Sequence, residues 1–283
     1  MNKRIADEAE LPTRIKPRQV ADWLLEHEIS SVTIDEMAVI LGIPRNQVSS
    51  RMVTLRNRLQ FVALTLGLWM PVAPEHRYCG APPAIEIIDV LMNHFNIDYY
   101  IGWLWAAQLH GVAHIAIGGN TGDFTQPYQV ATSRMVKDRE IGIWQFQFFM
   151  RKRIGSVGLV HLPVKDSEVP VSSVETTLLD LANDIDIVGG IDSAAGIIIQ
   201  LCRVCEPNIG VLTALSDVYP ITAVRRLGYI LERFLNMKGL GKLKKASDER
   251  NTTTTLLDPS IAKAGRLNTR WNLRVNKKLS PDI

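Results

Sequence analysis

The chain has 283 residues, 46% hydrophobic content, a formal net charge of +3 and three cysteines. This length and composition are typical of a globular protein with two domains. Three cysteines are too few for a disulfide framework, the first twelve residues lack the apolar core of a secretory signal, and the longest apolar run (61–73) is too short to cross a bilayer. We therefore expect a cytoplasmic protein with no membrane partner.

Residues 18–58 have the pattern of three short helices. The apolar residues of 18–28 recur at helical spacing. Thr33 followed by Glu36 is a capping box that begins the second helix, and Gly42 is suited to end it. Pro44 stands at the start of the third helix, where proline is tolerated.

The third helix has one apolar stripe and a polar, basic remainder. Val48, Met52, Leu55 and Leu59 recur at spacings of four, three and four, which places them on one face. The opposite face and its flanks hold the residues that we predict to bind DNA: Arg45, Asn46, Gln47, Ser49, Ser50, Arg51, Thr54, Arg56 and Arg58.

This layout suits a recognition helix in a major groove. Amides and hydroxyls can reach base edges while guanidiniums hold the phosphates on either side. Residues 41–74 hold four arginines and no acid, whereas residues 1–40 hold five basic and eight acidic residues. Positive charge is thus gathered on one element, as expected for DNA binding. The alternative is an arginine-rich amphipathic helix with a solvated outer face.

A hairpin is predicted after the three helices. Gly67 divides a β-prone apolar run, and Pro71 confines its second strand to an edge or an end. Three helices and a hairpin make a winged helix-turn-helix. Because residues 61–72 carry no charge, we expect this hairpin to pack against the protein rather than grip phosphates. We predict an α+β fold with a DNA-binding domain at 1–74, a linker at 75–83 and a mixed α+β domain at 84–283.

The second domain shows clusters of helices and strands without strict alternation, which favours α+β. Helices are predicted at 84–95, 99–110, 172–181 (with a capping box at Ser172 and Glu175), 191–205, 210–218 and 221–235. Strands are predicted at 129–131, 141–150, 158–163, 254–257 and 271–275, and residues 237–250 are interpreted as a basic connection.

Signals for enzymatic chemistry are weak. Cys202 and Cys205 form a lone pair without further ligands, so core thiols are the better interpretation. His110 and His114 lack the glutamate of a metalloprotease helix. The glycine-rich stretches 118–122 and 239–242 lack the Lys-Ser/Thr of a phosphate-binding loop. We predict no catalytic residue, no metal site and no cofactor.

The C-terminal segment 236–283 is strongly basic, with eleven Lys and Arg against four Asp and Glu. One interpretation is a solvated surface, which is the commoner meaning of such a run. The other is a second contact with nucleic acid or an acidic partner. Its cations are Lys242, Lys244, Lys245, Arg266, Arg270 and Arg274 among others.

Several segments beyond residue 83 resemble the AbiEi family of bacterial antitoxins. The YYIGWLWAAQLHG of 99–111 resembles that family's "YY…L.A..LHG" segment, and 171–181 resembles its "VS..E.T.LDL" segment. Residues 226–232 are similar to its "RLGYLLE" helix, and 257–259 with 271–276 to its closing strands. The order of the segments also matches.

The resemblance implies an antitoxin of a type IV toxin–antitoxin pair linked to abortive phage infection. Its N-terminal winged helix would repress the operon by binding inverted repeats in promoter DNA. Its C-terminal domain would counteract a nucleotidyltransferase toxin, commonly without a stable complex. The charge-free hairpin departs from a basic wing, and no antitoxic residue is transferred. Two alternatives are an antitoxin that sequesters its toxin by direct binding and an enzyme that reverses the toxin's product on RNA.

Overall fold

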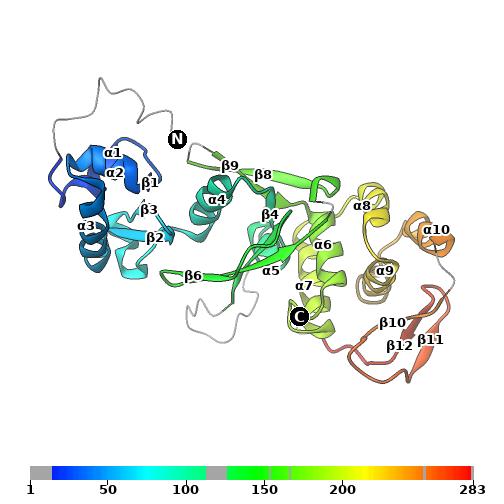
Figure 1. The fold of residues 1–283 in the computed structure, drawn as a ribbon. Helices are drawn as coiled ribbons and strands as arrows, with labels where there is room; N and C mark the ends of the chain where they lie inside the picture. Colours follow the sequence, from blue (N-terminus) through cyan, green and yellow to red (C-terminus); the bar gives the residue numbers. More distant parts are fainter. Residues whose placement is uncertain (1–14, 113–125, 153, 166, 251–252, 282–283) are drawn as a thin grey trace.

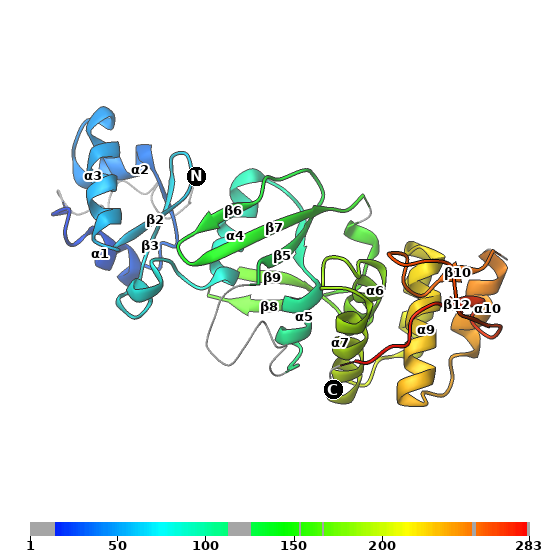
Figure 2. The same cartoon turned by 90° about the horizontal axis from the view of Figure 1, so that it is seen from below.

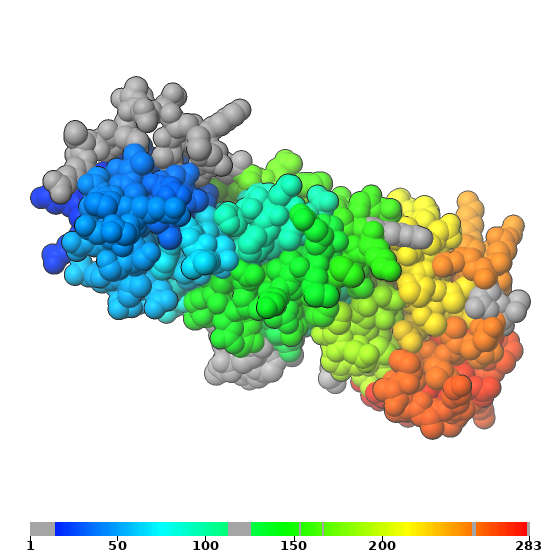
Figure 3. All heavy atoms as spheres, in the orientation of Figure 1, coloured from blue at the N-terminus to red at the C-terminus, as the bar shows by residue number. Residues whose placement is uncertain are grey.

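The computed structural model describes residues 15–112, 126–152, 154–165, 167–250 and 253–281. Helices and three separate sheets follow one another along an elongated molecule (Figure 1), an outline that the space-filling view repeats (Figure 3). The expected mixture of helices and strands is confirmed. None of the helices in the described ranges is long and apolar enough to span a membrane.

The N-terminal part packs three helices on a small sheet. Its elements are α1 (Val20–Glu26), β1 (Val32–Thr33), α2 (Ile34–Leu41), α3 (Arg45–Asn57), β2 (Phe61–Thr65) and β3 (Leu68–Pro71). The capping box is present, because Glu36 N–H donates to Thr33 Oγ1 at 3.3 Å and Thr33 N–H donates to Glu36 Oε2 at 2.7 Å. Gly42 ends α2 with φ +60°, as predicted, and Pro44 is the N-cap residue of α3.

The β2–β3 hairpin lies between two hydrophobic cores. Strand order in its sheet is β1-β3-β2, so β3 is central and Pro71 stands at its end. Phe61 belongs to the core beneath α1, α2 and α3. Val62, Leu64 and Met70 belong instead to the core that contains α4 and one face of the large sheet. The predicted packing of this charge-free hairpin against the rest of the chain is confirmed.

The segment predicted as a linker has structure of its own. Residues Pro74–Cys79 form a 3-10 helix, in which Arg77 pairs with Asp22 of α1 at 3.2 Å. Farther on, the indole N–H of Trp144 donates to the carbonyl oxygen of Pro82 at 2.8 Å. The connection is therefore bonded to the elements on both sides of it.

A six-stranded sheet forms the middle of the molecule, with strand order β6-β7-β5-β4-β9-β8 (Figure 2). The pairs β5–β7 and β4–β9 are parallel, and the remaining pairs are antiparallel. The elements of this part are α4 (Ala84–Phe95), β4 (Tyr99–Ile101), α5 (Trp103–Leu109), β5 (Tyr128–Thr132), β6 (Arg139–Ile141), β7 (Trp144–Met150), η2 (Ile154–Ser156), β8 (Leu159–Val164) and β9 (Ser167–Ser172).

Two predictions in this part are wrong. The helix expected over 99–110 begins only at Trp103, because Tyr99–Ile101 is strand β4, with Tyr99 and Ile101 in one core and Tyr100 in the other. Alternation of this kind is the two-residue period of a strand between two cores. The expected capping box at Ser172 is absent, because Ser173 caps the next helix and Glu175 accepts from the backbone N–H of Asn208 at 2.8 Å.

The C-terminal part is a helical layer with a small sheet against it. Its elements are α6 (Val174–Asn183), α7 (Ile191–Val204), α8 (Ile209–Leu215), η3 (Ser216–Val218), α9 (Ile221–Leu235), α10 (Gly241–Arg250), β10 (Thr255–Leu256), β11 (Arg266–Asn268) and β12 (Leu273–Val275). The basic connection predicted at 237–250 is wrong over most of its length, since 241–250 is α10. Strand β11 was not predicted.

Two adjacent arginines of α9 form buried hydrogen bonds with neighbouring elements of the C-terminal part. Arg226 is 5% exposed, and its guanidinium donates to the backbone carbonyl oxygens of Ala182 at 3.2 Å and Leu257 at 2.9 Å. Arg225 is fully buried and donates to Ser247 Oγ at 3.2 Å. Because a buried donor left unbonded is costly, these arginines tie α6, α10 and β10 to α9.

Gly228 lies where α9 meets an aromatic ring of the final segment. Trp271 is 1% exposed, and its indole N–H donates to Glu232 Oε2 at 2.8 Å. A Cβ at position 228 would lie 2.3 Å from two ring carbons of Trp271. Only glycine lets the ring reach this position.

We predict that Gly228→Ala destabilises the protein by about 1–3 kcal/mol, because the added methyl displaces a buried ring. Thermal unfolding should show a lowered midpoint. Gly241→Ala is the matched control, since a Cβ there meets nothing within 4 Å and should leave the midpoint nearly unchanged. Equal midpoints for Gly228→Ala and the parent protein would contradict this account.

Candidate nucleic-acid interface

Helix α3 has the two faces that the sequence predicts. Val48, Met52 and Leu55 are buried in the N-terminal core, at 2% exposure or less. Leu59 does not continue this stripe, because it lies beyond the end of α3 with φ +57° and is 46% exposed. All nine residues predicted to bind DNA are exposed: Arg45, Asn46, Gln47, Ser49, Ser50, Arg51, Thr54, Arg56 and Arg58.

The nine residues differ in how free their polar groups are. The hydroxyls of Ser50 and Thr54 donate to backbone carbonyls one turn earlier in α3, at 2.9 and 3.1 Å. The guanidinium of Arg45 pairs with Asp35 of α2 at 2.9 Å, although both side chains are about 70% exposed. An exposed pair of this kind is weak, so Arg45 can exchange Asp35 for another anion at little cost.

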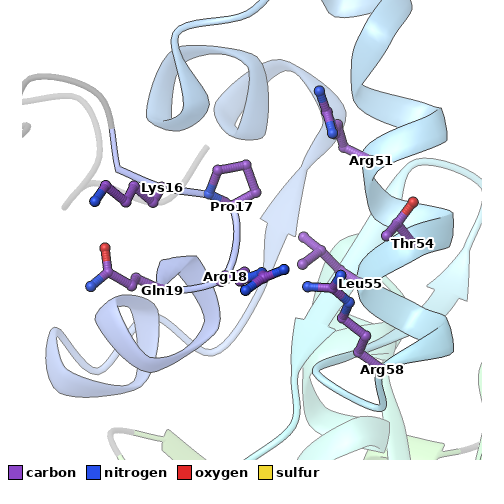
Figure 4. Close-up of a pocket in the computed structure, with 8 residues that line it drawn as sticks. All are labelled: Lys16, Pro17, Arg18, Gln19, Arg51, Thr54, Leu55 and Arg58. Carbon is purple, nitrogen blue, oxygen red and sulfur yellow. The ribbon is translucent and has the colours of Figure 1, made fainter.

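A basic cleft of about 530 Å³ lies beside α3, on the side of α1. The chain entering α1 forms one wall and the C-terminal half of α3 forms the other (Figure 4). Its lining residues are Lys16, Pro17, Arg18, Gln19, Arg51, Thr54, Leu55 and Arg58. Four of them are cationic and none is acidic, so the electrostatics favour an anion.

Lys16 and Arg18 were not predicted as site residues. They precede a helix in a stretch whose overall charge is negative, and they lie more than thirty positions before Arg51. Local charge counting therefore gives no signal for them. Only the tertiary fold, in which α1 and α3 share one hydrophobic core, brings these cations together.

A buried polar network joins the large sheet to the helical layer. Asp180 of α6 is fully buried, and its two carboxylate oxygens accept from the hydroxyls of Tyr100 at 3.1 Å and Tyr219 at 2.8 Å. Burial raises the pKa of Asp180 to about 7, against the lowering effect of Arg151. Asp184, one turn later, pairs with Arg151 and accepts from the indole N–H of Trp103.

A cavity of about 240 Å³ adjoins this network, and Tyr100, Asp180 and Tyr219 are among its lining residues. Asp180 has no exposed surface, and each of its oxygens already has a tyrosine donor. A fully satisfied buried network fixes the relative position of the elements that supply it.

Several other residues that the sequence analysis considered have partners within the protein. Lys244 and Lys245 pair with acids one turn later in α10, and Arg270 pairs with Glu232, so part of the C-terminal positive charge is offset. Cys205 donates its thiol to the carbonyl oxygen of His110 at 3.4 Å, and burial raises the pKa of Cys202 to about 12.

No cluster of three metal-ligating side chains occurs within the described ranges. His114 and the stretch 118–122 lie outside the residues that the structure describes. The segment 239–242 leads into α10.

No protein-family model and no curated protein matches the chain. Among solved structures, it is similar to the RV2827C protein from Mycobacterium tuberculosis, with a TM-score of 0.62, 14% sequence identity and coverage of 94% of both chains. At this identity the likeness shows a shared fold over nearly the whole chain and nothing further. An antigenic nucleotidyltransferase-like protein from Paracoccidioides brasiliensis matches at a TM-score of 0.35 and 11% identity, over 57% of this chain and 90% of that chain, and carries no argument.

The titration of Asp180 gives a prediction about stability. Its pKa is raised in the folded state, so its contribution to stability is fully present below its unfolded pKa of about 4 and is lost as the pH rises through about 7. An asparagine side chain at this position would not titrate. We therefore expect the stability of Asp180→Asn relative to the parent protein to improve between pH 5 and pH 8.

Urea unfolding at several pH values measures this difference. Asp217→Asn is the control, because Asp217 is an exposed carboxylate close to Tyr219 in the chain. The difference in unfolding free energy between Asp217→Asn and the parent protein should not vary with pH as that of Asp180→Asn does. A difference for Asp180→Asn that does not change with pH would show that the buried carboxyl does not titrate in this range.

Proposed function

We propose that the protein is a DNA-binding repressor whose N-terminal part is a winged helix-turn-helix with α3 as the recognition helix. The observation that carries the proposal is the outer face of α3, where exposed amides lie between exposed guanidiniums. Asn46 and Gln47 would read base edges in the major groove, while Arg51, Arg56 and Arg58 would contact phosphates or guanine. Three helices followed by a hairpin support the winged-helix interpretation.

The proposed target is promoter DNA with inverted repeats. One winged helix covers a single half-site, so two copies of the chain would occupy a pair of repeats. Binding there would repress the operon that encodes the protein. The protein would act in the cytoplasm, where its promoter is found.

We further propose that the protein is the antitoxin of a type IV pair and counteracts a nucleotidyltransferase toxin, with no catalytic step of its own. Contacts between the segments that resemble AbiEi antitoxins support this proposal. Tyr100 bonds Asp180, and the ring nitrogen Nε2 of His110 lies 2.7 Å from the carbonyl oxygen of Ser172. Separate resemblance segments thus build one framework, as a shared fold requires.

Those same contacts are structural, so they assign no antitoxic residue. The alternative proposal is that the C-terminal domain sequesters the toxin by direct protein–protein binding, with DNA binding secondary. Sequestration requires a stable complex between this protein and the toxin, whereas the first proposal does not.

We predict that Gln47→Ala reduces discrimination between the protein's own upstream DNA and a scrambled fragment, at a cost of about 1–3 kcal/mol on the upstream fragment alone. Arg56→Ala should weaken binding to both fragments. Fluorescence anisotropy measures both effects. Gln108→Ala, which removes an exposed amide from α5, is the control. Unchanged binding by both α3 variants would refute the assignment of this helix.

Co-expression with the partner toxin tests the antitoxin proposal. We expect the protein to restore growth, and Gln47→Ala to restore it equally when both proteins are expressed from foreign promoters, because α3 would act only on transcription. Size-exclusion chromatography of the mixed proteins should give two separate peaks. A shared peak would favour sequestration, and failure to restore growth would remove the antitoxin proposal.

A further inference from the structure

The β2–β3 hairpin is poorly suited to hold DNA phosphates. Residues 61–71 contain no Lys or Arg. One side of the hairpin is buried against α4 and the large sheet, and a guanidinium N–H of Arg139 donates to the carbonyl oxygen of Leu64 at 3.2 Å. Leu66, at its turn, is 98% exposed but apolar. If α3 enters a major groove, its own arginines can reach nearby phosphates, but the hairpin adds no cation to them.

The cleft between α1 and α3 offers those cations in a specific arrangement. Arg18 and Arg58 extend their guanidiniums toward one another from opposite walls, whereas the side chain of Arg51, farther along the α3 wall, points away from these two (Figure 4). Within the described part of the chain, none of these three guanidiniums forms an ion pair. An anion between two guanidiniums that face each other would offset their mutual repulsion, which solvent weakens at this exposed site.

We infer that Arg18 and Arg58 hold a phosphate of the DNA backbone between them, with Arg51 farther along the same cleft, and that this contact adds to those of α3 where the hairpin makes none. The inference rests on the proposed recognition role of α3. Guanidinium groups suit a phosphate because their N–H donors form a planar fork that matches its oxygens. Thr54 lines the same cleft, but its hydroxyl already donates to the carbonyl oxygen of Ser50, so the arginines supply the donors.

The site would position the protein rather than read sequence. Arg18 precedes α1, whereas Arg51 and Arg58 belong to α3 or its C-terminal end. A phosphate bound between Arg18 and Arg58 would fix how deeply α3 lies in the groove and its register along the duplex. The contact would lie on the α1 side of α3, where Gln60 Nε2 donates to the carbonyl oxygen of Arg18 at 3.2 Å.

Arg18→Ala is the decisive variant, because Arg18 lies outside the recognition helix and is exposed. We expect about a tenfold loss of affinity for the upstream fragment and a similar loss for scrambled DNA, since the contact is to backbone. The slope of log K against log salt should fall by about one. Arg18→Lys keeps the charge and should keep most of the slope while losing part of the affinity.

Arg203→Ala is the matched control, because Arg203 is an exposed arginine at the end of α7, outside the N-terminal part. Anisotropy titrations of the full chain on both fragments, over a range of KCl concentrations, separate four outcomes. Preference for the upstream fragment with a reduced slope in Arg18→Ala supports both the phosphate site and the repressor proposal. The same preference with Arg18→Ala equal to Arg203→Ala overturns the phosphate site alone.

The remaining outcomes concern a protein that binds both fragments equally. A reduced slope in Arg18→Ala would then support a phosphate site while removing the sequence-specific repressor proposal. An unchanged slope would overturn both. Thermal unfolding of each variant should stay close to that of the parent protein, since Arg18 and Arg203 are both exposed.

Discussion

The structure depends on one short hairpin that is apolar on both sides. Phe61 packs under α1, α2 and α3, while Val62, Leu64 and Met70 pack with α4 and the large sheet. Burial of such side chains contributes about 1.5–3 kcal/mol each. Two hydrophobic cores therefore share one small sheet, and the bonded segment at residues 74–82 runs beside it. A change in the hairpin would disturb the helices and the large sheet together.

If the N-terminal part is a winged helix, as proposed, this arrangement separates packing from phosphate binding, which a wing usually combines. The hairpin has a packing role, and this role excludes charge at its buried positions, because a lysine or arginine facing a core would have to be desolvated. Positive charge lies instead on α3 and on the chain that leads into α1. The C-terminal part is built differently, with buried arginines and a buried tryptophan that join its last strands to α9.

Local patterns predicted the local structure well. The capping box at Thr33 and the end of α2 at Gly42 depend on neighbours in sequence, and both are present. The prediction of a single helix over 99–110 was wrong because Tyr99–Ile101 pairs with β5, about thirty residues away. Local sequence patterns carry no information about such distant pairing. Helix α10 was missed because few of its residues are apolar, and much of its attachment comes from distant residues such as Arg225.

In the candidate site, too, local sequence predicted some residues and missed others. The outward face of α3 followed from helical spacing, whereas Arg18 joined the site only through tertiary packing. The resemblance segments proved to be partners of one another, as Tyr100 with Asp180 illustrates. Contacts of this kind hold the framework together and do not mark a partner-binding surface.

The contacts of Arg226 determine which substitutions this part of the sequence can tolerate during evolution. Its guanidinium donates to the carbonyl oxygens of residues 182, 256 and 257, and every amino acid supplies such an oxygen. These hydrogen bonds therefore allow many residue types at the three acceptor positions but require the arginine at position 226. Related chains would then keep the donor and vary the acceptors, so pairwise covariation between these positions would be weak despite their close contact.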